Sequence, residues 1–429
     1  MLNKIRAKFG SKEGVLVKNT FMLYVLQFST YILGIIVVPY ETRILGKGVY
    51  GILGAATAVM VYFQLFIDFG FILSATEDIS KHRTDREYIS KVFTSVTINK
   101  LILTAVSAVA LVVLCNVIEN WYADRYFYYL FFIATAVNSL IPDYLYRGLE
   151  QMTVITVRTI IIKLFFTAMI FIFLKSPSDY YVVPILNIIG NTGALLGVYV
   201  HLFRKLKIKF IRCEKSFVWN CMKRSSTFFY SRIATTVYTA SNTVLLSVVY
   251  PSGSAETGLY TSADKLITTG KNGLSPISDS LYPYMVKHRD YKMVKRIMMI
   301  IMPIIILGTA VLFVFSKPFC VLFFGSEFAD VAPVLRSMLP IAIVILPSYL
   351  CGFPMLSAMN LSKHANYSVI FGSAVHILNL VILYFTHNFS PVMLGAATSL
   401  TETLILAYRL VVIYIHRDRL KTDKKEEGV

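Results

Sequence analysis

Charged side chains are scarce in this sequence: they make up 15% of its 429 residues, whereas hydrophobic residues make up 56%. The mean hydropathy is +0.63. A soluble domain cannot bury that much apolar surface, because a typical soluble chain is about 25% charged. The composition therefore argues against a soluble protein and predicts an all-α membrane protein that crosses the bilayer many times.

Cysteine is also rare, and no catalytic motif stands out. The five cysteines are scattered at positions 115, 213, 221, 320 and 351, without a CxxC pair. This spacing indicates neither a disulfide framework nor a zinc site, so we expect no metal and no cofactor. A Ser/His/Asp elbow, a phosphate-cradling loop and a paired-carboxylate cluster are missing as well. We therefore expect no catalytic residues and no enzyme.

Apolar runs of spanning length, in contrast, recur along the whole chain. About twelve are predicted, at residues 19–39, 49–74, 92–116, 126–146, 153–174, 181–203, 217–249, 258–285, 297–315, 331–357, 366–386 and 391–415. They predict five regions: a basic amphipathic cytoplasmic segment (1–18), an N-terminal six-helix bundle (19–203), a basic cytoplasmic linker (204–216), a C-terminal six-helix bundle (217–415) and a charged cytoplasmic tail (416–429). Similar tetrapeptides, GVYG at 48–51 and GLYT at 258–261, open the second and eighth spans, which supports two related halves.

The positive charge follows the loops. Of the 42 lysines and arginines, 30 fall in segments that share a side with the N-terminus, and 5 fall in the opposite loops. Because cytoplasmic loops are rich in Lys and Arg, this asymmetry places both termini in the cytoplasm. The net charge of +18 is then explained by the basic cytoplasmic loops, and we expect no nucleic-acid partner.

The eighth span, 258–285, is polar on one face. At about 100° per residue, Asp264, Lys271, Asn272 and Asp279 fall within one sector, while leucines and isoleucines fall in another. A polar face in a spanning segment lines either a water-filled cavity or a polar helix interface. Glycines and Pro276 in the middle of the segment predict a kink or local unwinding there.

Other cations lie inside the predicted spans. They are Arg232, Lys265, Lys163 and Lys100, which join Lys271 as candidate substrate-binding residues. A buried cation needs an anion, so each one either contacts an anionic ligand or forms a salt bridge, for example with Asp264 or Glu402. Arg158 and Arg409 lie near the predicted inner surface, and we expect their side chains to extend to the interface.

Three acids also lie within or beside the spans: Asp68, Asp143 and Glu402. Protonatable acids are what ion-coupled transport requires, but helix capping or pairing with a cation explains them equally well. The first span carries no interior cation, and Gln27 is its candidate cavity residue.

Three stretches resemble polysaccharide repeat-unit flippases, the O-antigen and capsule exporters of the multidrug/oligosaccharidyl-lipid/polysaccharide exporter superfamily. They are VPYETRILGKGVYG at 38–51, DFGFILSATEDISKHR at 68–83 and the eighth span at 258–285. The resemblance implies two six-helix bundles around a central cavity. It also implies that undecaprenyl-diphosphate-linked oligosaccharide is moved by alternating access from the inner to the outer leaflet of a bacterial plasma membrane.

The implied partners are this lipid-linked substrate, membrane lipid, and the polysaccharide polymerase and chain-length regulator that act on the product. Two other functions stay open. An ion-coupled drug antiporter of the same fold would favour an acidic cavity, and the spans hold more cations than acids. A membrane-embedded glycan polymerase or acyltransferase would need a large external loop or a His/Asp pair near the surface, and neither is predicted.

Overall fold

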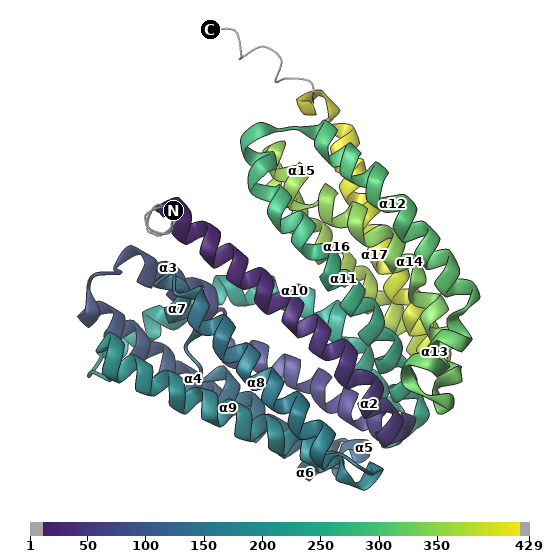
Figure 1. The fold of residues 1–429 in the computed structure, drawn as a ribbon, viewed down its shortest axis with the longest axis horizontal. Coiled ribbons are helices and arrows are strands. Elements are labelled where there is room, and N and C mark those ends of the chain that lie inside the picture. The colour runs from purple at the N-terminus through teal and green to yellow at the C-terminus, as the bar shows by residue number, and fades with distance from the viewer. Residues whose placement is uncertain (1–11, 421–429) are drawn as a thin grey trace, which may run out of the picture. The chain divides into compact units, whose positions relative to one another are not determined.

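The computed structural model describes residues 12–420, and between these residues it contains helices and no strand (Figure 1). The helices up to the linker are α2 (Lys12–Asp68), α3 (Phe71–Lys81), α4 (Arg86–Val117), α5 (Glu119–Tyr122), α6 (Arg125–Ser139), α7 (Asp143–Gly148), α8 (Met152–Phe173) and α9 (Val182–His201). After the linker come α10 (Lys215–Val249), α11 (Ala255–His288), α12 (Tyr291–Val314), α13 (Ser316–Phe324), α14 (Val331–Cys351), α15 (Phe353–Ala358), α16 (Ser362–Phe385) and α17 (Pro391–Ile415). The predicted terminal segments lie partly outside the described residues, at 1–11 and 421–429.

The prediction of an all-α protein with many spans is confirmed. Eight helical segments of the described chain are long and apolar enough to cross a membrane. The first of them, Phe21–Lys81, has 61 residues, about 90 Å at helical rise, so it is long enough for two spans. Within it the chain turns at Gly46, which has φ 66° and ψ 171°. Helical segments cover all twelve predicted spans, and the two more polar spans correspond to α10 and α11.

Three of the predicted spans are interrupted by a break. In the second span, α2 ends at Asp68 and α3 begins at Phe71, because Phe69 and Gly70 between them have φ 41° and 79°. A Cβ at Gly70 would lie 2.7 Å from the carbonyl oxygen of Ser225, so glycine is required for this close approach. The fourth span breaks at Pro142, and the tenth breaks at Gly352 between α14 and α15.

The eighth span behaves differently from the expectation. Helix α11 is continuous from Ala255 to His288 although Pro276 and Pro283 lie inside it. Of the predicted kink or local unwinding, the unwinding is therefore wrong, since the backbone stays helical around both prolines.

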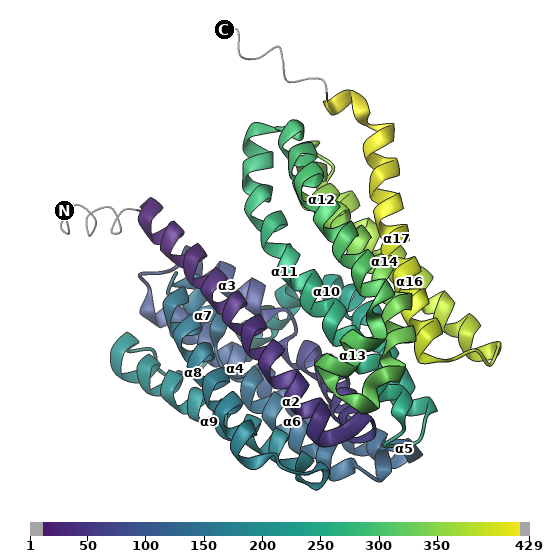
Figure 2. The same cartoon turned by 45° about the vertical axis from the view of Figure 1, so that its right-hand side comes forward.

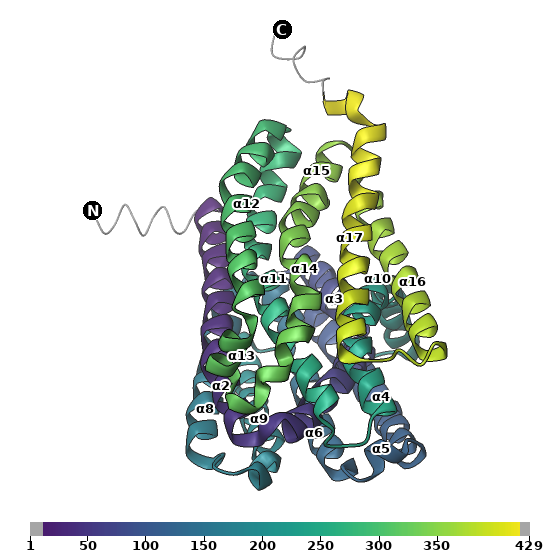
Figure 3. The same cartoon turned by 90° about the vertical axis from the view of Figure 1, so that its right-hand side faces the viewer.

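The chain forms two compact units. The first contains 1–233 with 247–252, and the second contains 234–246 with 253–429. In the first unit α2 packs on α8 and α6, and α9 packs on α6 and α8 (Figure 1). In the second unit α14 is central: it packs against α17, α11 and α12, and α16 covers α17 (Figures 2 and 3). The predicted linker belongs to the first unit.

The linker lies along α4. The backbone N–H groups of Lys209 and Ile211 donate to the hydroxyls of Ser90 and Thr94, over 3.3 and 3.1 Å. Phe210 packs its ring on that of Phe93, with centroids 4.8 Å apart. These contacts satisfy backbone groups that extended chain would otherwise leave unpaired.

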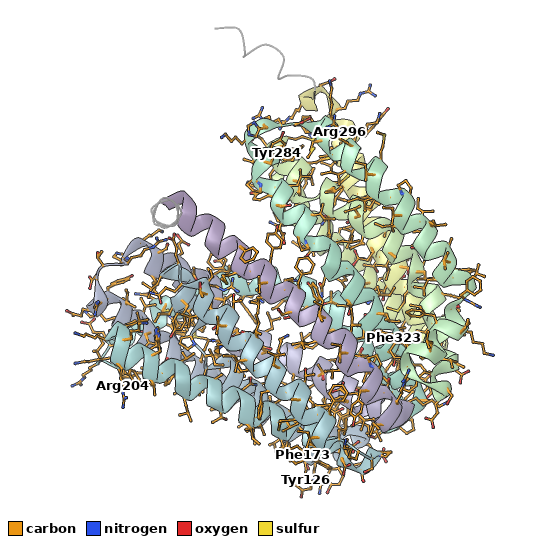
Figure 4. All side chains as sticks on the ribbon, in the orientation of Figure 1. Tyr126, Phe173, Arg204, Tyr284, Arg296 and Phe323 are labelled. Carbon is orange, nitrogen blue, oxygen red and sulfur yellow. The ribbon has the colours of Figure 1, made fainter. Side chains whose placement is uncertain are left out.

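In each unit, residues near the predicted cytoplasmic loops and residues near the predicted outer loops lie at opposite ends. In the first unit, Arg204 lies at one end and Tyr126 and Phe173 at the other (Figure 4). In the second unit, Tyr284 and Arg296 lie at one end and Phe323 at the other (Figure 4). This separation agrees with helices that alternate across a bilayer.

Candidate functional site

The polar face of α11 meets α17 at an ion pair. The Nζ of Lys271 donates to Oε1 of Glu402, and the two side chains are 16% and 3% exposed. The sequence leaves open whether Lys271 contacts a ligand or an internal acid, and in this structure it contacts Glu402. A carboxylate buried this deeply keeps its charge only beside a cation, so each residue stabilises the charge of the other.

A small cavity adjoins Lys271. It has a volume of about 20 Å³, and Asp264, Thr268, Tyr238 and Tyr260 line it together with Lys271. A single water molecule needs roughly 10–15 Å³ of such volume. The cavity therefore has room for about one water, and a diphosphate or sugar can enter only if the lining helices separate.

A buried hydrogen-bond network shares Tyr260 and Thr398 with this cavity. Asn242 Nδ2 donates to the Tyr260 hydroxyl over 2.6 Å and to the Thr398 hydroxyl over 2.8 Å. The His376 ring bonds Asn242 Oδ1 through Nε2 and the Thr401 hydroxyl through Nδ1, both over 3.0 Å. The network therefore joins α10, α11, α16 and α17.

Neither Asn242 nor His376 is among the predicted site residues. The signal for them is present in the sequence, because an amide and an imidazole inside predicted spans need hydrogen-bond partners as much as a charge does. Charge alone is thus too narrow a criterion for polar groups inside a bilayer.

Arg409 is a further polar group of α17, and it is only 8% exposed. Its Nε donates to Ser368 over 2.9 Å, and its Nη1 donates to the carbonyl oxygen and hydroxyl of Ser348 over 2.6 and 2.9 Å. The expectation that Arg409 extends to the interface is wrong. Its guanidinium instead turns inward, where α14 and α16 offer three oxygen acceptors.

In the first unit, two helix ends meet at Lys100. The Nζ of Lys100 donates to Oδ1 of Asp68, the last residue of α2, over 2.8 Å. It also donates to the carbonyl oxygen of Ser139, the last residue of α6, over 2.5 Å. A cation is favourable at helix C-termini because the terminal carbonyls carry partial negative charge. A predicted substrate cation and a predicted coupling acid thus contact each other.

Asp143 is paired as well. It opens α7 after the break at Pro142, and its two carboxylate oxygens accept from Arg158 of α8 over 2.6 and 3.1 Å. The Arg158 side chain is 15% exposed. The expectation that Arg158 extends to the interface is therefore wrong, because the helix break brings a carboxylate to it.

The remaining predicted residues occupy mixed environments. Lys265 and Asp279 are exposed on α11, and Arg232 is exposed on α10. Lys163 of α8 and Asn272 of α11 are half-buried. Lys265 differs from its neighbour Asp264 in exposure because one helical step rotates it by about 100°.

Gln27 is half-buried on α2, and its amide donates to the Tyr31 hydroxyl one turn later. Between residues 12 and 420, no cluster of three or more His, Cys, Asp or Glu side chains is close enough to hold a metal ion.

The fold is similar to that of solved membrane transporters. It is similar to a MATE family multidrug resistance transporter of the MOP superfamily in an inward-facing conformation, with a TM-score of 0.69 at 12% identity over 92% of this chain and 96% of that one. It is also similar to the lipid II flippase MurJ in an inward closed conformation, with a TM-score of 0.65 at 15% identity over 94% of this chain and 89% of that one.

The chain belongs to the polysaccharide biosynthesis protein family, whose model matches residues 16–289. It is 26% identical to a Shigella dysenteriae protein named "Putative O-antigen transporter", over 92% of this chain and 99% of the relative. It is 24% identical to an Escherichia coli K12 protein of the same name, over 94% of this chain and 97% of the relative. The resemblance carried by the three stretches is thereby confirmed.

Proposed function

We propose that this protein is a transporter that flips undecaprenyl-diphosphate-linked oligosaccharide repeat units from the inner to the outer leaflet of a bacterial plasma membrane. The family assignment supports a role in polysaccharide biosynthesis. Two relatives that carry the O-antigen transporter name align with this chain over almost their whole length. The transported units would supply O-antigen, capsule or exopolysaccharide.

The observation that carries this proposal is the Lys271–Glu402 pair. A lysine on the polar face of α11 is held by an acid of the same unit, beside a cavity that admits about one water. A lipid diphosphate offers the same chemistry as Glu402, namely anionic oxygens that accept charge-assisted hydrogen bonds. We propose that the diphosphate replaces Glu402 on Lys271 once the lining helices separate, as alternating access requires.

The other predicted cations extend this site. Arg232 and Lys265 are exposed, and exposed cations within membrane-spanning helices are suited to an anionic ligand in a water-filled cavity. Lys163 is a further candidate. We propose a structural role first for Lys100, because its Nζ already binds Asp68 and a helix C-terminus.

The orientation is proposed from the loop charges. The excess of Lys and Arg on one side supports an orientation with both termini and the linker in the cytoplasm of a bacterial cell. Transport from the inner to the outer leaflet then delivers repeat units to the side where a polymerase and a chain-length regulator act on them.

An ion-coupled drug antiporter is the second candidate, and the fold likeness to a MATE transporter favours it. In that function Glu402 or Asp264 would bind an organic cation. The predicted spans hold more cations than acids, which disfavours this role, because an organic cation favours an acidic cavity.

The test uses a bacterial strain that makes a surface polysaccharide and lacks its own repeat-unit transporter. Expression of this chain should restore surface glycan and remove the lipid-linked repeat units that accumulate in its absence. An enzyme that polymerises the glycan would restore no surface glycan, because the repeat units would stay on the inner side of the membrane. A drug antiporter would change sensitivity to organic cations and leave the accumulated lipid-linked units in place.

A further inference from the structure

A long apolar groove runs between α8 and α9 in the first unit. Its volume is about 730 Å³, within the roughly 300–1,000 Å³ typical of small-molecule sites. Gly190, Gly193 and Gly197 of α9 line one side, and branched side chains of α8 such as Ile161 and Ile162 line the other. Nothing in the proposed transport step uses this groove.

The glycines explain why the groove exists. A Cβ at Gly190 would lie 3.1 Å from Cγ2 of Ile162, so α8 and α9 touch there. A Cβ at Gly193 or Gly197 would meet no atom within 4 Å. The helices thus contact at one end of the groove and leave open space beside the next two glycines.

The groove is open at the surface of the first unit, and its length is close to the depth of one leaflet. Three of its lining residues, Val157, Ile161 and Ile189, are 48%, 61% and 52% exposed. The twelve helical steps from Thr153 to Phe165 span about 18 Å. The hydrocarbon of one leaflet is about 15 Å deep, half of a core of about 30 Å.

One end of the groove is polar, and the ion pair of Arg158 with Asp143 lies there. Arg158 and His201 line it there, and His201 bonds the Tyr146 hydroxyl over 2.9 Å. The Nε of Arg158 is buried and has no hydrogen-bond partner among the described residues. Arg204 and Lys205, both exposed, follow His201 within about one turn.

We propose that this groove binds one anionic phospholipid of the surrounding membrane. An acyl chain lies along Gly193 and Gly197, and the phosphate lies at the end formed by Arg158 and His201. Basic pockets between membrane helices select anionic head groups in this way. The one-leaflet length fits a phospholipid of the leaflet beside Arg204, whereas a long polyisoprenoid carrier would extend beyond the groove.

The bound lipid fills the space between α8 and α9 and so stabilises the first unit. A ligand that binds only the folded state raises the melting temperature, and the effect grows with the ratio of its concentration to its dissociation constant. Binding of this lipid does not depend on which molecule the protein transports, so it can be detected without a transport assay.

The experiment measures the melting temperature of the full chain in detergent with added phosphatidylglycerol or phosphatidylcholine. The variant Gly193→Leu/Gly197→Leu fills the groove. The control is Gly308→Leu on α12, an exposed glycine whose Cβ would also meet no atom within 4 Å. Phosphatidylglycerol should stabilise the wild type and the control more than phosphatidylcholine does, and the groove variant should lose this difference.

Four outcomes would overturn the proposal. One is a groove variant that keeps the full phosphatidylglycerol effect, and another is an equal effect of both lipids on the wild type. A third is native mass spectrometry that shows a wild-type dimer which the groove variant dissolves, because glycine stripes also pack helices of a second copy. The fourth is co-purification of a polyisoprenyl phosphate in place of phospholipid. If the double variant does not fold, Gly197→Leu is compared with Gly308→Leu by counting bound phosphatidylglycerol in the same instrument.

Discussion

Lys100 Nζ lies 2.8 Å from Asp68 Oδ1, so a cation of α4 binds the last residue of α2 at the point where the second span breaks. The Lys100 side chain is 7% exposed and that of Asp68 is 22% exposed. A pair this buried is costly to open, because the remaining charge has neither water nor a partner.

Replacement of Lys100 by alanine should therefore destabilise the protein by about 3–5 kcal/mol. The matched control is Lys91→Ala on the same helix, where an exposed pair with Glu87 should contribute only about 0–1 kcal/mol. The melting temperature and the folded yield in detergent measure both effects. The double change Lys100→Met/Asp68→Leu should recover most of the loss. Equal effects of Lys100→Ala and Lys91→Ala would show that the pair is not structural.

The Lys271–Glu402 pair predicts separable effects on folding and transport. Lys271→Met alone leaves the carboxylate of Glu402 buried without its cation, so folded yield should fall. Lys271→Met/Glu402→Gln removes both charges and should restore yield. If Lys271 binds the diphosphate, this double variant stays unable to restore surface glycan. Recovery of glycan together with yield would show that Lys271 serves structure alone.

Arg232 gives a complementary prediction because it is exposed on α10. Arg232→Ala should change the free energy of unfolding by no more than about 0.5 kcal/mol, as exposed substitutions usually do. The amount of folded protein should therefore stay close to that of the wild type. Surface glycan in the complementation strain should nevertheless be lost. A proportional loss of protein and glycan contradicts the proposed contact with substrate.

The topology is tested by cysteine accessibility. Ser178→Cys and Asn388→Cys, both at exposed positions of predicted outer loops, should react with an impermeant thiol reagent in intact cells. Arg204→Cys, at the opposite end of the first unit, should react only after the membrane is opened (Figure 4). A background with Cys213→Ser removes the half-buried native thiol. The reverse labelling pattern would reverse the proposed direction of transport.

Helix α11 is continuous in this structure, and replacing two glycines in its middle tests whether it bends during transport. A Cβ at Gly270 or Gly273 would meet no atom within 4 Å, so alanine fits at both positions. Gly270→Ala/Gly273→Ala should add about 0.5–1 kcal/mol of stability per site. If α11 must bend during transport, translocation of lipid-linked sugar should slow while the melting temperature rises. Unchanged translocation would show that α11 moves as a rigid helix.

Much of the fold is predictable because hydropathy and helix breakers act locally. The apolar runs mark the twelve spans, since every backbone polar group inside a bilayer must be satisfied within its own helix. The chain turn at Gly46 and the break at Pro142 occur at residues whose backbone preferences are known in advance. The continuity of α11 through Pro276 was not predictable, because a proline favours a break locally, whereas α11 also packs against distant helices such as α14.

The sequence by itself determined the spans, their alternation and the presence of costly polar groups inside them. Only the tertiary structure decided which groups meet. Lys271 and Glu402 are 131 positions apart, and His376 and Asn242 are 134 positions apart. Helical periodicity places each side chain on a face of its own helix, but the partner depends on how distant helices pack. For the same reason the open space at Gly193 and Gly197 follows from the course of α8, a neighbour that no local pattern in α9 specifies.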